Sequence, residues 1–127
     1  VYYEDTDAGG VVYHAVYLNY MERARTEWLR ALGFEQDVLM RDHGLVFAVH
    51  RAAVDYLRPA RFNDALSVSC QPTLCKGARV EFRQEIRVEG QQDVLCQADI
   101  RVACIDLARG RPRLIPALIA AKLHDVL

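Results

Sequence analysis

The sequence of 127 residues lacks any apolar run of the roughly 18–20 residues that cross a bilayer as a helix, and it lacks an excess of charge. Sixteen basic and seventeen acidic residues give a formal net charge of −1, so the composition predicts neither a nucleic-acid partner nor attraction to an anionic membrane. Internal repeats, low-complexity tracts and linkers are also missing. We therefore predict one domain over residues 1–127, with one core and no membrane span.

Cysteine pairs of the kind that bind zinc are absent as well. The four cysteines have no CxxC spacing, and no histidine lies within zinc-motif reach of two of them. Cys70, Cys96 and Cys104 fall on apolar faces of expected strands, where a free thiol behaves as a small hydrophobe. We therefore expect no metal site, reduced thiols and a cytoplasmic location. The chain begins at Val1 rather than methionine, which leaves open a missing N-terminal or targeting segment.

The apolar residues that are present follow helical spacing near the N-terminus. Residues 1–6 are rich in β-formers and predict a short first strand, which the glycines after Asp7 end. From about residue 15 to Leu32 the spacing is that of an amphipathic helix, and Gly33 stands where a helix commonly ends. The apolar stripe of this helix is Tyr17, Tyr20, Met21, Ala24, Trp28, Ala31 and Leu32.

Four strands are expected next, because apolar and polar residues alternate over 45–57, 65–75, 78–89 and 94–106. Their expected inner faces are, in order, Val46, Ala48, Ala52, Val54 and Tyr56; Leu66, Val68, Cys70 and Leu74; Val80, Phe82, Ile86 and Val88; and Val94, Cys96, Ala98, Ile100, Val102 and Cys104. Shorter helices are expected over 36–42 and 116–124. With so few crossover helices the chain cannot be doubly wound. We predict an α+β fold in which an antiparallel sheet of about five strands wraps around the long helix.

The candidate catalytic residues lie in residues 4–14, EDTDAGGVVYH. In this segment acidic residues precede a glycine turn that leads into the expected long helix. A helix N-terminus exposes unpaired N–H groups that can polarise a carbonyl. A carboxylate beside it can act as a nucleophile or as a base for water. From spacing alone, an ordinary turn aspartate that complements the helix dipole explains the segment equally well.

The run from Thr6 to Tyr17, TDAGGVVYHAVY, resembles the active-site signature of the 4-hydroxybenzoyl-CoA thioesterase family, and more closely that of the YbgC branch of hotdog-fold acyl-CoA thioesterases. The resemblance continues through Tyr20–Arg25, YMERAR, through Val54–Arg61, and more loosely to Pro112–Pro116. It covers nearly the whole chain. It implies the hotdog fold, which agrees with the layout expected from periodicity.

The resemblance also implies roles for individual residues. Asp7 matches the catalytic aspartate of the family. His14 matches the position whose backbone N–H polarises the thioester carbonyl, and its side chain is implicated together with the tyrosine matched by Tyr3. Without the resemblance, the sequence would predict a packing or capping role for His14 and an ordinary strand position for Tyr3.

Other polar residues are weaker candidates. Coenzyme A carries phosphates, for which Lys76 and Arg79 are the first candidates and Arg58 and Arg61 the next. His50, on an apolar strand face, reads as a hydrogen-bonded core histidine. Some hotdog thioesterases use a helix glutamate, a role open to Glu22 and Glu27, although both positions also suit solvated helix surface.

The resulting hypothesis is hydrolysis of acyl-CoA thioesters with Asp7 as nucleophile or general base and with no metal or organic cofactor. The resemblance further implies a homodimer or homotetramer with sites between subunits, and a link to the Tol-Pal envelope system and phospholipid metabolism. Two alternatives stay open: hydration or dehydration of an acyl thioester on the same fold, and a non-catalytic module that binds acyl-CoA or an envelope-associated protein. Asp7 and His14 stand seven residues apart, which is not the spacing we expect for the hydratases.

Overall fold

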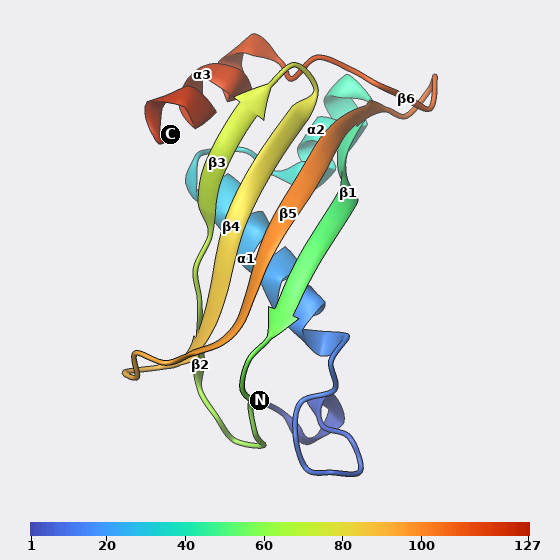
Figure 1. The fold of residues 1–127 in the computed structure, drawn as a ribbon. Coiled ribbons are helices and arrows are strands. Elements are labelled where there is room, and N and C mark those ends of the chain that lie inside the picture. Colours follow the sequence, from blue (N-terminus) through green and yellow to red (C-terminus); the bar gives the residue numbers. More distant parts are fainter.

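The computed structural model describes residues 1–127 and consists of an antiparallel sheet packed against one long helix (Figure 1). That helix, α1 (Val16–Ala31), crosses one face of the sheet. Two short helices, α2 (Gln36–His43) and α3 (Ala117–Asp125), lie at the end of the sheet away from the N-terminus. The predicted sheet around one long helix is thus confirmed. None of the helices combines the length and apolar character needed to span a membrane.

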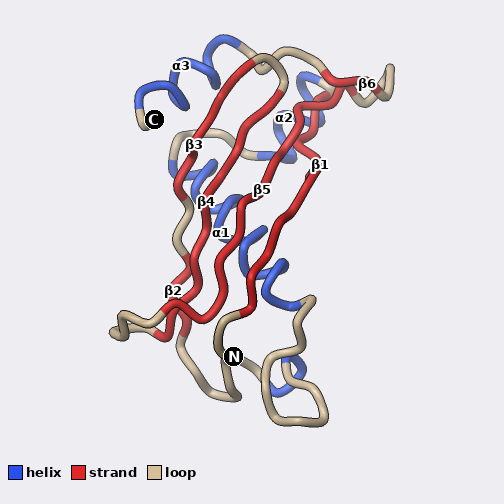
Figure 2. Tube along the Cα trace, in the orientation of Figure 1, coloured by secondary structure: helices blue, strands red, loops and turns tan.

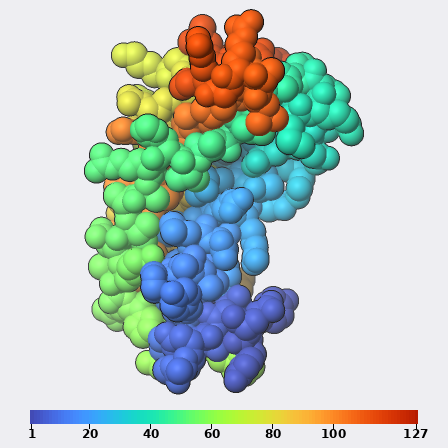
Figure 3. Space-filling view, turned by 90° about the vertical axis from the view of Figure 1, so that its right-hand side faces the viewer, coloured from blue at the N-terminus to red at the C-terminus, as the bar shows by residue number.

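The sheet has six strands, all paired antiparallel (Figure 2). They are β1 (Leu45–Tyr56), β2 (Leu66–Val68), β3 (Gln71–Lys76), β4 (Arg79–Val88), β5 (Val94–Asp106) and β6 (Arg111–Pro112). The order is β1-β5-β4-β2, with β3 also pairing β4 and β6 pairing β5. β1 is an edge strand, with β5 as its one neighbour. Figure 3, turned toward that edge, shows β1 and α1 reaching the surface together.

The core forms where the apolar stripe of α1 meets the inner faces of β4 and β5. Met21, Ile86, Cys96 and Cys104 are fully buried there, as the two-residue alternation of both strands predicts. Gln84 is the exception, because it occupies an inner-face position and is fully buried although it is polar.

Three bulges correct the predicted strand faces. At the start of β5, a shift pairs Val94 with Arg87 on the outer face, so that Leu95, not Val94, is buried. In β1 the pairing with β5 shifts between Val49 and Arg51, so that Phe47 and Val49, not Val46 and Ala48, share the face of Ala52. The extra residue is His50, which is exposed and not the core histidine expected. The predicted strand 65–75 is likewise divided into β2 and β3, and a shift between Pro72 and Leu74 puts Cys75, rather than Leu74, in the core.

The predicted first strand over residues 1–6 is wrong. Tyr3–Asp5 form a turn of 3₁₀ helix, and only one isolated bridge joins Thr6 to Val12. Local side-chain bonds compete with strand pairing here: an Asp5 oxygen accepts from the Tyr2 N–H at 2.9 Å, and the Thr6 hydroxyl donates to the Tyr3 carbonyl at 2.7 Å.

Candidate active site

Asp7 lies in a tight exposed turn near the N-terminus. Its N–H donates to the Val11 carbonyl at 2.9 Å, and its carbonyl accepts from the Gly10 N–H at 3.0 Å. Gly10 has a φ of 77°, which favours glycine. The Asp7 carboxylate is held by one bond within this turn, since Oδ1 accepts from the Gly9 N–H at 2.8 Å. The second oxygen, Oδ2, makes no hydrogen bond within the chain and remains available to a ligand.

Gly9 is required beside this carboxylate for a steric reason. A Cβ built on Gly9 would lie 3.2 Å from Asp7 Oδ1, which is tighter than most contacts of a real Cβ. The glycine therefore allows its own N–H to approach the carboxylate without a side chain pushing the carboxylate away.

His14 immediately precedes Ala15, the N-cap residue of α1. The Asp5 carbonyl accepts from the Tyr13 N–H at 2.9 Å, which joins the two ends of the loop that carries Asp7. The N–H of His14 makes no hydrogen bond within the chain, whereas its carbonyl accepts from the Tyr56 hydroxyl at 3.0 Å. A free N–H at the start of the long helix is the donor that the sequence analysis expects.

Tyr3 is not brought to either residue. Its side chain is 81% exposed and meets Phe62 edge to face, with ring centroids 6.3 Å apart. No hydrogen bond connects its phenol to Asp7 or His14. One copy of the chain therefore gives Tyr3 no contact through which it could act with them.

Two tyrosines that the sequence analysis did not assign to the site support it. Tyr56 donates to His14 and packs against Tyr17, with centroids 5.5 Å apart. The Tyr17 hydroxyl accepts from the buried Ala60 N–H at 2.9 Å. Burial raises the pKa of both phenols, which therefore remain protonated. The available signal was that a tyrosine on an apolar face needs a partner for its hydroxyl.

The basic candidates fall into two groups. Lys76 and Arg79 flank the β3–β4 turn, which lies at the end of the sheet opposite the N-terminal loop (Figure 1). The length of β4, about 30 Å, separates this turn from the loop that carries Asp7. One chain cannot bring them to a ligand held at Asp7. Arg58 pairs with Asp93 at 3.0 Å. Arg61 is nearer the turn, because its backbone bridges to Val11 and its exposed side chain forms no ion pair.

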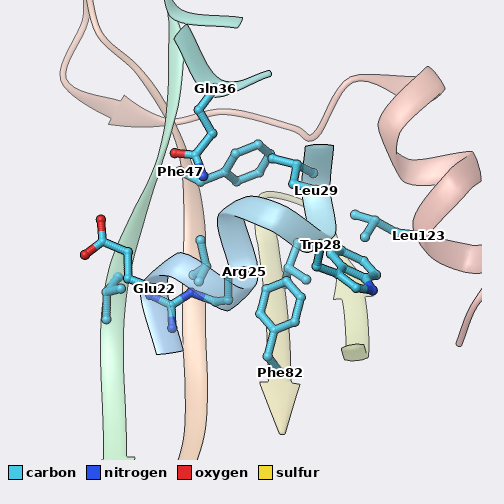
Figure 4. Close-up of a pocket in the computed structure, with 11 residues that line it drawn as sticks. Glu22, Arg25, Trp28, Leu29, Gln36, Phe47, Phe82 and Leu123 are labelled. Carbon is cyan, nitrogen blue, oxygen red and sulfur yellow. The ribbon is translucent and has the colours of Figure 1, made fainter. Parts of the chain in front are cut away.

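The alternative acids on α1 differ in their surroundings. Glu27 is exposed and pairs with Arg30. Glu22 is exposed but lines an apolar cavity of about 200 Å³ between α1 and the sheet (Figure 4). Neither is near the start of the helix. No group of three or more histidine, cysteine or acidic side chains is arranged to hold a metal ion.

Comparison with known proteins agrees with the fold. The family model described as the thioesterase-like superfamily matches residues 1–123. An acyl-CoA thioesterase YbgC of Haemophilus influenzae is 45% identical over 99% of this chain and 91% of its own length. A crystal structure of a 1,4-dihydroxy-2-naphthoyl-CoA thioesterase from Synechocystis superposes with a TM-score of 0.91 and 25% identity, covering 99% of this chain and 92% of the other. A probable thioesterase from Bartonella henselae gives a TM-score of 0.84 and 36% identity over 91% and 94%. The hotdog fold is therefore confirmed.

Proposed function

This chain belongs to the thioesterase-like superfamily, and from that premise we propose that it hydrolyses acyl-CoA thioesters at the turn that carries Asp7. Its similarity to the acyl-CoA thioesterase YbgC of Haemophilus influenzae supports the substrate class. The residue roles rest on the geometry of the turn and of the start of α1.

The proposed reaction needs a polarised carbonyl and an oxygen nucleophile. The free N–H of His14, at the positive end of α1, stabilises the negative charge that develops on the thioester oxygen. In one route Asp7 attacks the carbonyl carbon, CoA leaves as the thiolate, and water hydrolyses the acyl-aspartate anhydride. In the other, Asp7 removes a proton from water, the hydroxide attacks, and the CoA thiolate leaves and is protonated.

One observation carries this proposal. Asp7 presents one oxygen fixed by Gly9 and one that is free, and its loop closes just before the start of α1, where the N–H of His14 is unpaired.

The test measures thiol release over a panel of acyl-CoA substrates for wild type, Asp7→Asn and Asp7→Ala. Both variants should lose at least about 10²-fold in kcat/KM, as expected for removal of a base or nucleophile, while thermal unfolding stays unchanged. Asp125→Asn, an exposed aspartate at the end of α3, is the matched control. Equal activity of Asp7→Asn and this control would refute the role of Asp7. Hydration of enoyl-CoA without thiol release would favour a hydratase, and tight binding without turnover a non-catalytic module.

The assembly is a second part of the proposal. β1 is an edge strand of 12 residues that pairs with β5 on one side only, and an open edge of this length is a surface for pairing with another strand. These features support a homodimer or homotetramer in which sites form between subunits. In such an assembly Lys76 and Arg79 of one copy could reach CoA phosphates held by another, with Arg61 contributing from the copy that carries Asp7.

The cellular setting is proposed from weaker support. All four cysteines are free, and three of them are buried, which fits a reducing compartment such as the cytoplasm. The link to the Tol-Pal envelope system and phospholipid metabolism stays a prediction from the resemblance.

A further inference from the structure

The cavity between α1 and the sheet contains a cation that the proposed reaction does not use. The cavity measures about 200 Å³, and most of its walls are apolar, with Trp28, Phe47, Phe82 and Leu123 among them. Arg25, which is half-buried, also lines it and belongs to α1, as Trp28 does (Figure 4). No residue of the Asp7 turn lines the cavity, so this space is separate from the candidate active site.

Gln84 determines where the Arg25 guanidinium lies. The side-chain nitrogen of this fully buried glutamine donates to the Met21 carbonyl at 3.0 Å and to the Ser69 carbonyl at 3.3 Å. Its oxygen therefore faces Arg25 and accepts from Nη1 at 2.9 Å. A buried polar residue on an otherwise apolar sheet face is costly unless it is fully bonded, and here its bonds hold an arginine at the cavity wall.

The charge of Arg25 is not balanced by any carboxylate of the chain. None of the ion pairs of the protein includes Arg25. Burial lowers the pKa of its guanidinium, which is the effect of poor solvation on a cation. Cys70 lies nearby, but burial raises the pKa of its thiol to about 12, so that it is neutral at physiological pH. One bond to Gln84 leaves most of the five N–H donors of the guanidinium free for an anionic ligand.

We propose that this cavity binds a medium-chain fatty acid, with the carboxylate on the Arg25 guanidinium and the alkyl chain among the apolar walls. A planar guanidinium matches a carboxylate better than it matches a neutral hydroxyl. The alkyl chain covers apolar wall that is otherwise in contact with water, and this burial favours binding in proportion to the area covered. Such acids are products of the proposed hydrolysis, but their binding here does not require that reaction.

The walls follow the order that such a ligand needs. Along α1, Arg25 comes first, and Trp28 and Leu29 follow about 4.5–6 Å further along the helix axis. Leu123 lies beyond them, in α3 at the end of the sheet away from the N-terminus (Figure 1). The carboxylate therefore lies at the end of the cavity nearer the start of α1, and the chain extends away from it. A cavity of about 150 Å³ already holds a benzene ring, so this larger space suits a chain of medium length.

The cavity is open to a ligand between α1 and the edge of the sheet. Glu22 of α1 and Val49 of β1 both line it, and both are exposed. Pairing of another strand with β1 uses backbone groups in the plane of the sheet, whereas the cavity lies on the inner face. Binding of the acid and pairing at this edge are therefore compatible.

Trp28 allows binding to be measured directly, because it is the single tryptophan of the chain and lines the cavity. The test titrates the protein with hexanoate, octanoate and decanoate below their micelle concentrations and follows the fluorescence of Trp28. At least one acid should give a saturable change. The alcohol of the same chain length should bind at least about tenfold more weakly, as expected when a hydrogen bond to a charged group is lost.

Brominated octanoate tests the direction of the ligand, because bromine quenches tryptophan fluorescence only at short range. Bromine on the last carbon should quench Trp28 more than bromine on the carbon beside the carboxylate, since the chain extends from Arg25 toward Trp28. The reverse order would overturn the assignment of the carboxylate to Arg25.

Four variants separate the charge from the rest of the site. Arg25→Met should bind octanoate and octanol equally, and Arg25→Lys, which keeps the charge without the planar fork, should retain part of the preference. Arg23→Met removes an exposed arginine of the same helix outside the cavity and should bind octanoate as wild type does. Asp7→Asn should also bind it unchanged, because Asp7 does not line the cavity.

Three results would overturn the inference: no saturable response to any of the acids, equal binding of acid and alcohol by wild type, or unchanged binding of octanoate by folded Arg25→Met. If Arg25→Met does not fold, the comparison of acid with alcohol in wild type decides. Binding that Asp7→Asn weakens and Arg25→Met does not would place the acid at the candidate active site and overturn the inference as well. Failure of thioester hydrolysis would refute the proposed function alone, because binding is measured without turnover.

Discussion

Gly9→Ala tests how closely the position of the Asp7 carboxylate is controlled. The added Cβ would lie 3.2 Å from Oδ1, so the carboxylate must move by a few tenths of an ångström. A misplacement of 1 Å can cost about 10²-fold in rate, and a shift of this smaller size predicts a loss of roughly three- to tenfold in kcat/KM. Stability should change little, because the turn is exposed and alanine restricts the unfolded chain more than glycine does.

Gly10→Ala is the matched perturbation in the same turn. Gly10 has a φ of 77° and no atom within 4 Å of an added Cβ. Alanine there should cost about 1–2 kcal/mol of backbone strain, which lowers Tm by several degrees (about 2–8 °C per kcal/mol over the relevant domain sizes), without a direct push on Asp7. We therefore expect Gly9→Ala to lose activity and Gly10→Ala to lose stability.

The assay is thiol release at subsaturating acyl-CoA, combined with thermal unfolding of each variant. Full activity in Gly9→Ala would refute the reasoning, because the carboxylate position would then not matter to turnover. An equal loss of activity in both variants would point to general disruption of the turn and would refute it as well.

The remaining predictions concern the helix start and alkaline stability. His14→Pro, which removes the backbone donor, should lose about 10²–10³-fold in kcat, whereas His14→Ala should lose less; the reverse order, measured by thiol release with folding checked by circular dichroism, would assign the role to the imidazole. Burial raises the pKa of Cys70 to about 12 and, with a contribution from Asp55, that of Cys96 to about 11, from an ordinary 9.0. A group whose pKa is raised on folding stabilises the folded protein fully at pH values below its pKa in the unfolded chain, and this stabilisation is lost as the pH rises toward its pKa in the folded protein. The urea midpoint of unfolding should therefore fall as pH rises from about 9 toward 11. A midpoint that stays constant or increases over that range would contradict the assignment.

The parts of the fold that could be predicted are those in which one spacing rule holds without interruption. α1, the inner face of β4 and that of β5 from Cys96 onward follow their periodicities, and the structure confirms them. The first half of β1 was assigned to the wrong face because an inserted residue changes the parity of a strand without changing its composition. Residues 1–6 were predicted as a strand from β-propensity, which local bonds from Asp5 and Thr6 override.

The candidate site also has parts that the sequence could predict and parts that it could not. The turn at Asp7 and the open N–H of His14 were within reach of the sequence, because glycines and a helix start are local features. Tyr56, Arg25 and Gln84 were not assigned roles, because their contacts join residues 42, 59 and 63 positions apart along the chain. The separation of Lys76 and Arg79 from Asp7 also depends on the path of β4, which no local pattern specifies.

The bulge at His50 bears on the contact between the sheet and the start of α1. Because the bulge takes up the extra residue, the pairing of β1 with β5 continues in phase beyond it, and Tyr56 pairs with Cys96 on the inner side, where its hydroxyl reaches the His14 carbonyl. Deleting His50 would leave a regular strand in which residues 51–56 keep their partners and faces. The loss of one residue between Ala52 and Tyr56 would instead turn the tyrosine to the outer side, and the start of α1 would lose its tether. Natural variants are therefore expected to tolerate a change of length at the bulge and not between the bulge and Tyr56.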